Sequence, residues 1–69
     1  MRLVAPMAAS IYDITHPEGA KVEKGRPCMI IESMKMMIDI MAPQDGIVKK
    51  IFVQVGEVVA EGTPLMEIV

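Results

Sequence analysis

A lysine with a methionine on each side stands at the midpoint of this 69-residue chain, in the run Glu32-Ser33-Met34-Lys35-Met36-Met37. The side-chain amine of a lysine is protonated near neutral pH and becomes a nucleophile only after it loses that proton. On an exposed segment another protein must remove the proton, so Lys35 by itself would be a solvated charge. Its chemical interest comes from its place in the chain.

The two halves of the chain resemble each other around this lysine. When residues 38–69 are aligned with residues 1–32 by a shift of 37 positions, nine residues are identical without a gap. Because the matches include glycines and prolines, which determine turns and the starts of strands, the halves are predicted to follow the same backbone course. The matching pairs are Ala5 and Ala42, Pro6 and Pro43, Ile14 and Ile51, Gly19 and Gly56, Val22 and Val59, Gly25 and Gly62, Pro27 and Pro64, Met29 and Met66, and Ile31 and Ile68.

The composition indicates one small domain with an aliphatic core. Of the residues, 52% are hydrophobic and 3% aromatic, so Ile, Val, Leu, Met and Ala must fill the core. Cys28 is the only cysteine, which excludes an internal disulfide, and no Cys and His cluster offers a structural metal site. Most of the eight methionines are expected at alternating strand positions, as core residues rather than ligands of a soft metal.

Charge and hydropathy argue against two classes of partner. The formal net charge is −2 and the seven basic residues are scattered along the chain, which is no footprint for nucleic acid. No stretch approaches the length of a membrane span, and the N-terminal residues lack the apolar run of a secretion signal. We therefore expect a cytoplasmic protein with no nucleic-acid partner and no membrane partner.

Short β-prone runs broken by Gly and Pro predict an all-β chain, because no long segment keeps a helical period. A bend is expected at Ala8-Ala9-Ser10. The segments 16–25 and 54–62 each contain two glycines six residues apart and are expected to be loops with one or two extended residues inside them. The predicted longer strands are residues 2–5, 11–14, 28–32, 36–42, 46–53 and 64–69, with Asp39 and Glu67 facing outward and their neighbours Ile38, Ile40, Met66 and Ile68 inward.

A single domain, residues 1–69, is expected to fold as a flattened β-barrel of two four-stranded antiparallel sheets with pseudo-twofold symmetry. The repeat halves 1–32 and 38–69 would be joined by the hairpin 33–37, with Lys35 at its tip and the chain termini at the opposite end. Two-residue hairpin turns favour Asn-Gly or Asp-Gly, so Met34-Lys35 breaks a local rule at this tip. Such a break in an otherwise consistent sequence is where function is expected.

The motif E-S-M-K-M, preceded by a β run that starts at a proline and followed by A-P-x-x-G-I-V, resembles the biotin-attachment domain of biotin-dependent carboxylases, decarboxylases and transcarboxylases. The resemblance covers essentially the whole chain and implies the barrel-sandwich fold. It implies that biotin protein ligase attaches biotin covalently to Lys35, with Met34 and Met36 as flanking recognition residues. It also implies a non-catalytic carrier, which shuttles a carboxyl group between biotin carboxylase and carboxyltransferase components.

Three positions depart from the pattern of that family. Ser33 stands where Ala is most common before the first methionine, and Met37 stands where Glu is frequent after the second. The first half has Ala5-Pro6-Met7-Ala8-Ala9 in place of A-P-M-P-G, so a turn glycine is lost there, whereas Gly46 keeps it in the second half. These departures leave Lys35 in place and together indicate a divergent branch of the family. The sequence does not determine how Ser33 and Met37 affect recognition by a ligase.

Two other functions stay open. A lipoyl carrier domain of a 2-oxo acid dehydrogenase shares this fold and the hairpin lysine, but that lysine usually follows Asp and precedes Ala, so Met34 and Met36 favour biotin. An unmodified barrel-sandwich interaction module has no reason to keep a lysine at the hairpin centre. His16 is expected to be solvated and Cys28 to be an ordinary strand residue. The sequence does not determine the carboxyl acceptor, which could be an acyl-CoA, pyruvate or urea, or the oligomeric state.

Overall fold

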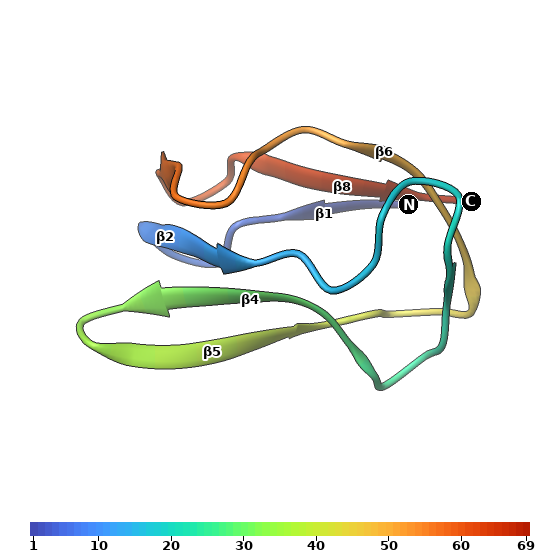
Figure 1. Cartoon of the computed structure of the whole chain (residues 1–69), viewed down its shortest axis with the longest axis horizontal. Helices are drawn as coiled ribbons and strands as arrows, with labels where there is room; N and C mark the ends of the chain where they lie inside the picture. The colour runs from blue at the N-terminus through green and yellow to red at the C-terminus, as the bar shows by residue number, and fades with distance from the viewer.

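A computed structural model describes residues 1–69 and contains eight strands and no helix (Figure 1). The all-β prediction is confirmed. None of its segments is a helix long and apolar enough to cross a membrane. In chain order the strands are β1 (Arg2–Val4), β2 (Ala9–Asp13), β3 (Lys21–Val22), β4 (Pro27–Ser33), β5 (Met36–Met41), β6 (Gly46–Ile51), β7 (Val58–Val59) and β8 (Pro64–Ile68).

The strands form two antiparallel sheets of four, one with the order β1-β8-β6-β3 and the other with the order β5-β4-β2-β7. The shift of 37 residues found in the sequence places β1 on β5, β8 on β4, β6 on β2 and β3 on β7. When each strand of one sheet is replaced by its equivalent in the other, the two strand orders are the same. The predicted pair of sheets and their pseudo-twofold relation are therefore confirmed.

Hydrogen bonds outside the strands repeat in the same way. The Gly25 amide donates to the Ala42 carbonyl at 2.9 Å, and the Gly62 amide donates to the Ala5 carbonyl at 2.8 Å. Gly62 is the repeat equivalent of Gly25, and Ala5 is the equivalent of Ala42, so the two bonds are equivalent. Each half thus places its loop glycine against the other half, so neither half can form its loops alone.

The core lies between the sheets and contains fourteen buried residues, none of them polar or charged. Twelve of the fourteen are six pairs related by the repeat. The symmetry of the sequence is thus also a symmetry of packing, because equivalent positions point inward in both sheets. The six pairs are Ala5 and Ala42, Ile11 and Val48, Val22 and Val59, Cys28 and Leu65, Met29 and Met66, and Ile31 and Ile68.

The expectation that most methionines fill the core was wrong. Only Met29 and Met66 are buried, whereas the other six are exposed. Three of the six lie on β5, which is an edge strand with no strand beyond it, and the other three lie at the N-terminus, in the loop between β1 and β2 and in the turn between β4 and β5. The exposed methionines are Met1, Met7, Met34, Met36, Met37 and Met41.

Two strand boundaries differ from the expectation by two residues, and six others differ by one residue. Ala9 and Ser10 belong to β2 rather than to a bend, because they pair with Val59 and Val58 of β7, a partner that is distant in the sequence. Strand β6 ends at Ile51 rather than at residue 53, and the Ile51 amide donates a hydrogen bond of 2.9 Å to the Glu18 carboxylate instead of to a neighbouring strand.

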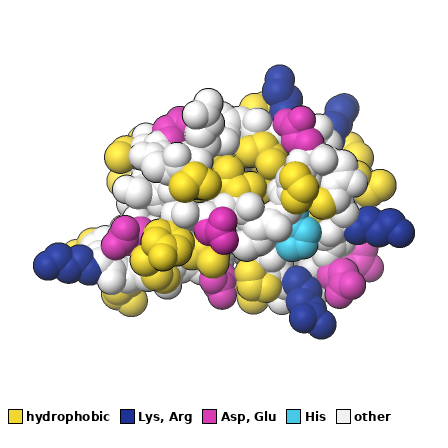
Figure 2. Space-filling model, in the orientation of Figure 1, with side chains coloured by type: hydrophobic (Ala, Val, Ile, Leu, Met, Phe, Trp, Pro, Cys, Tyr) yellow, Lys and Arg dark blue, Asp and Glu magenta, His cyan; other side chains and the backbone are white.

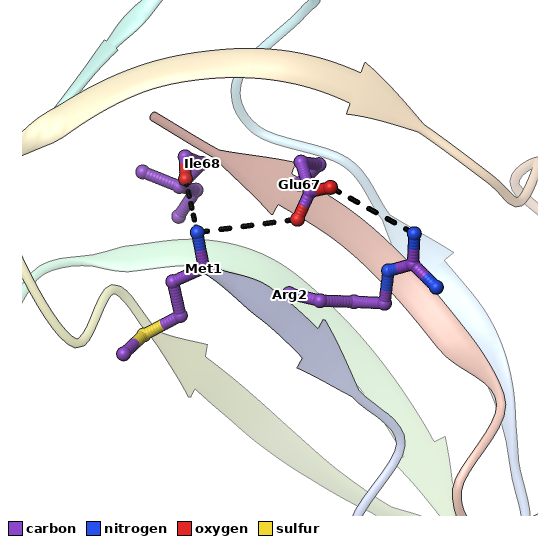
Figure 3. Close-up of polar contacts among 4 residues, drawn as sticks. All are labelled: Met1, Arg2, Glu67 and Ile68. Carbon is purple, nitrogen blue, oxygen red and sulfur yellow. Dashed lines mark hydrogen bonds and ion pairs between the residues drawn. The ribbon is translucent and has the colours of Figure 1, made fainter.

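The termini lie side by side at one end of the long axis, and the β4–β5 hairpin forms the other end (Figure 1). The N-terminal amine donates a hydrogen bond to the Ile68 carbonyl and lies 3.9 Å from the Glu67 carboxylate, which is also 3.7 Å from the Arg2 guanidinium (Figure 3). The exposed ion pairs contribute less than about 1 kcal/mol each. The predicted separation of the termini from Lys35 is confirmed.

Candidate functional site

Met34 and Lys35 are the two central residues of a tight turn between β4 and β5. The last pair of the ladder is Ser33 opposite Met36, and both turn residues have positive φ, 53° at Met34 and 64° at Lys35. A type I′ hairpin turn requires this conformation, which residues other than Gly, Asn and Asp adopt at a cost of about 1–2 kcal/mol each. Met34 and Lys35 are the only residues other than glycine with positive φ in the chain.

The ladder behind the turn holds these residues in place. Strands β4 and β5 share six residue pairs, the longest ladder in the molecule, from Pro27 opposite Met41 to Ser33 opposite Met36. Because Ile31 is fully buried in the core, β4 cannot slip by one residue without turning that side chain outward. The register therefore forces a two-residue connection, and Met34 and Lys35 take the left-handed conformation that it needs.

The turn presents its side chains to solvent. Met34 is 92% exposed and Met36 65% exposed, and Lys35 is exposed as well. None of the ion pairs includes Lys35, and in Figure 2 one basic side chain projects alone beyond the hairpin end of the molecule. The amine is thus accessible from almost every direction, with apolar groups on both sides of it.

Ser33 ties the base of the turn to the loop between β1 and β2. Its hydroxyl donates a hydrogen bond of 3.0 Å to the carbonyl of Ala8. Ser33 and Ala8 are separate departures from the family pattern, and nothing in the sequence predicts that they touch. No local signal could have revealed this contact, because the two residues are 25 positions apart and belong to different elements.

A cleft and the single cysteine of the chain lie away from the tip. Nowhere in the chain do three His, Cys, Asp or Glu side chains come together in a group that could hold a metal ion. An open cleft of about 450 Å³ lies elsewhere, along the loops that flank β3, and is lined by His16, Lys21, Glu23, Arg26 and Pro27. Cys28 is buried, and burial raises the pKa of its thiol, which keeps it protonated and unreactive. The arrangement offers one accessible amine and nothing that would activate it.

Comparison with known proteins places this geometry in a family. The family model described as "Biotin-requiring enzyme" matches residues 2–68. The chain is 38% identical over 68 residues to the biotin/lipoyl attachment protein of Bacillus subtilis (strain 168), covering 99% of this chain and 93% of that protein. It is 35% identical over 66 residues to the mitochondrial methylcrotonoyl-CoA carboxylase subunit alpha of Arabidopsis thaliana, covering 96% of this chain but only 9% of that protein.

A solved structure agrees with the sequence relatives. The crystal structure of the Kluyveromyces lactis urea carboxylase superposes with a TM-score of 0.92 at 29% identity, over 100% of this chain and 6% of that one. Relatives of this chain are thus either small proteins of similar length or short parts of large carboxylases. The family match over nearly the whole length and the shared fold lead to one conclusion: the chain belongs to the biotin/lipoyl attachment domains of biotin-requiring enzymes.

Proposed function

We propose that the chain is a biotin carboxyl carrier and that Lys35 is the residue to which biotin is attached. The observation that carries this proposal is the position of Lys35, exposed on a strained two-residue turn at the junction of two repeat halves. Residues held in a strained conformation concentrate at functional sites, which supports a function for the side chain that this turn presents. Met34 and Met36 flank this lysine and are proposed as the residues that a ligase recognises.

In this proposal Lys35 acts as a tether. Its amine, deprotonated by the ligase, attacks an activated carboxyl carbon, so that an amide bond forms, the activating group leaves and the nitrogen releases one further proton. Biotin then supplies a ureido nitrogen that can carry a carboxyl group. The rigid β4–β5 ladder holds the tether away from the body of the domain, and the tether keeps the carried group at a high effective concentration for the enzymes that use it.

The partners proposed for such a carrier are a biotin protein ligase, a biotin carboxylase component and a carboxyltransferase component. The domain itself is proposed to be non-catalytic, since the only group at its tip is an amine. Relatives named as carboxylase subunits support this choice, because a carrier domain of the same length forms part of them.

The test is the intact mass of the chain after co-expression with a biotin protein ligase and supplied biotin. We expect one biotinyl increment, which disappears in Lys35→Ala and in Lys35→Arg. Lys49→Ala is the matched control, because Lys49 is an exposed lysine of β6 in the other sheet, and it should keep the increment.

Each other outcome points to a different function. A lipoyl increment on Lys35 would replace the proposal with a carrier of a 2-oxo acid dehydrogenase. An unmodified chain in the presence of a ligase that modifies another carrier would contradict attachment and favour a module that serves only as a contact surface.

A further inference from the structure

The two sheets carry charges of opposite sign. The strands β5, β4, β2 and β7 contain three charged residues, all acidic, and no Lys or Arg. The strands β1, β8, β6 and β3 contain four basic residues and one acidic residue. The acidic residues of the first sheet are Asp13, Glu32 and Asp39, and the charged residues of the second are Arg2, Lys21, Lys49, Lys50 and Glu67.

The side-chain charges have opposite signs at two pairs of equivalent strand positions of the two repeat halves. Asp39 of β5 corresponds to Arg2 of β1, and Asp13 of β2 corresponds to Lys50 of β6. Because the backbone is the same at each pair of positions, the fold has no preference for either sign there. The charge difference is therefore a property of the surface and requires an explanation outside the fold.

The acidic groups of the first sheet are not neutralised within the chain. None of the ion pairs includes Asp13, Glu32 or Asp39. Asp13 and Asp39 are exposed and Glu32 is half-buried. In the ladder Asp39 lies opposite Ile30 and Glu32 lies opposite Met37, so both carboxylates belong to the outward-facing rows.

Apolar side chains lie among these carboxylates. Five large hydrophobic residues on the same four strands are about half exposed or more. The residues opposite one another form a row from Met37 through Glu32 and Ser10 to Val58, which crosses the whole sheet. The five exposed residues are Tyr12 (54%), Met36 (65%), Met37 (51%), Met41 (48%) and Val58 (76%).

This acidic and apolar face continues into the turn. In the chain, Met37 is separated from Lys35 only by Met36, which is also exposed. The hairpin is part of the acidic sheet, and the basic sheet reaches the molecule's other end, where the termini lie (Figure 1). Any protein that receives a group carried on Lys35 therefore meets the acidic sheet before the basic one.

We propose that the outer face of the sheet β5-β4-β2-β7 is the surface on which the biotin carboxylase component docks, which rests on the proposed carrier function. That component must bind ATP and bicarbonate, which are both anions, so positive potential surrounds the mouth of its active site. A carrier face with unpaired carboxylates around exposed Tyr12 and Met37 complements such a surface in charge and in hydrophobicity. The basic sheet would be repelled by the same potential.

Attachment of the cofactor would strengthen this docking. An amide on the Lys35 nitrogen removes the positive charge at the tip, so the charge of the four acidic strands together with the turn becomes one unit more negative. The loaded carrier is then attracted to a basic surface more strongly than the unloaded one. The carboxylase would thus distinguish the two forms at a distance, before the tether enters its site.

The experiment measures how the biotinylated chain serves as substrate for a biotin carboxylase purified from the same source, with ATP and bicarbonate. Asp39→Asn together with Glu32→Gln should raise the KM for the carrier about fivefold with little change in kcat, and should flatten its dependence on salt. The matched control, Lys21→Gln together with Lys49→Gln on the opposite sheet, should leave KM unchanged or lower it slightly. Unfolding midpoints of both variants would show that the fold is intact.

Three results would overturn the docking proposal. Equal KM values and salt slopes for the acidic-face and basic-face variants would contradict it while leaving the carrier function intact. Self-association of the chain that is lost in Asp39→Asn would assign the face to the basic sheet of a second copy. A carboxylase that turns over free biotin but ignores the biotinylated chain at every salt concentration would contradict the carrier function itself.

Discussion

The hairpin that bears Lys35 and the end that bears the termini are two versions of one structure. In the ladder of β4 and β5, Ile30 lies opposite Asp39, and in the ladder of β8 and β1 the equivalent residues Glu67 and Arg2 lie opposite each other. The first ladder is closed by a covalent turn. The second is closed by contacts between two chain ends, including the bond of the N-terminal amine to Ile68 (Figure 3).

The difference shows which part of the duplicated fold occurs only once. Within each half, the left-handed backbone positions are glycines at equivalent places, such as Gly19 and Gly56. At the junction of the halves they are Met34 and Lys35, which have no equivalent because the other ladder has no turn. Each half thus contains one copy of the scaffold, whereas the strained and accessible turn occurs only once, between the halves.

The test with the largest expected effect concerns two equivalent residues of the core, one from each half. Met29 and Met66 are equivalent and fully buried, so Met29→Ala and Met66→Ala should each destabilise the domain by about 3 kcal/mol. Urea unfolding followed by circular dichroism measures both values. Met37→Ala, at an exposed position of the same residue type, is the control and should cost less than about 0.5 kcal/mol. A difference of severalfold between the two core variants would show that the halves are not energetically equivalent.

The second test concerns a place where the repeat is broken for a steric reason. Gly46 is equivalent to Ala9, but a Cβ at Gly46 would lie 2.4 Å from the Val69 carbonyl oxygen and 2.7 Å from the Ile68 side chain. Gly46→Ala should therefore cost about 2 kcal/mol, whereas the reverse change Ala9→Gly should cost about 1 kcal/mol. Unfolding midpoints of the two variants measure this, and a neutral Gly46→Ala would mean that the C-terminal residues move aside.

The third test relaxes the turn. Replacing Met34 by Asn and Lys35 by Gly supplies residues that accept positive φ, so the double variant should be more stable by about 1–2 kcal/mol. Thermal unfolding should show a midpoint higher by several degrees. Exchanging only the amine, in Lys35→Met, is the control and should leave the midpoint nearly unchanged. A double variant no more stable than the parent would show that the turn stores no strain.

The test with the smallest expected effect concerns the hydrogen bond between Ser33, at the base of the turn, and Ala8. Ser33→Ala removes the hydrogen bond to Ala8 and should cost about 0.5–1 kcal/mol, since the hydroxyl is only partly buried. Ser33→Thr keeps a hydroxyl and should cost less. The Ala8 amide makes no backbone hydrogen bond, so adding Ala8→Pro should recover part of the loss by restricting the loop.

Hydrogen exchange of the hairpin amides would separate this local tie from a global effect. We expect Ser33→Ala to speed exchange in β5 near the turn more than in β8. Uniformly faster exchange in both sheets would mean that Ser33 contributes only to overall stability and does not position the turn.

Much of the fold could be predicted because it is encoded by local chemistry. The glycines and prolines that recur at a spacing of 37 determine the same turns twice, and the alternation around Asp39 and Glu67 orients two strands correctly. The prediction failed where the deciding contact was distant. Ala9 and Ser10 became a strand by pairing with β7, and Met36, Met37 and Met41 are exposed on β5, which lies at the edge of its sheet.

The features of the candidate site also separate into those that the sequence predicts and those that depend on distant contacts. The sequence by itself determined that a lysine between two methionines joins two copies of one unit, because that follows from residue identity and spacing. Only the tertiary structure decided the positive φ of Met34 and Lys35, the contact of Ser33 with Ala8 and the gathering of all acidic strand residues but one on one sheet. These features depend on which strands become neighbours, and burial of the core determines that only after the whole chain has folded.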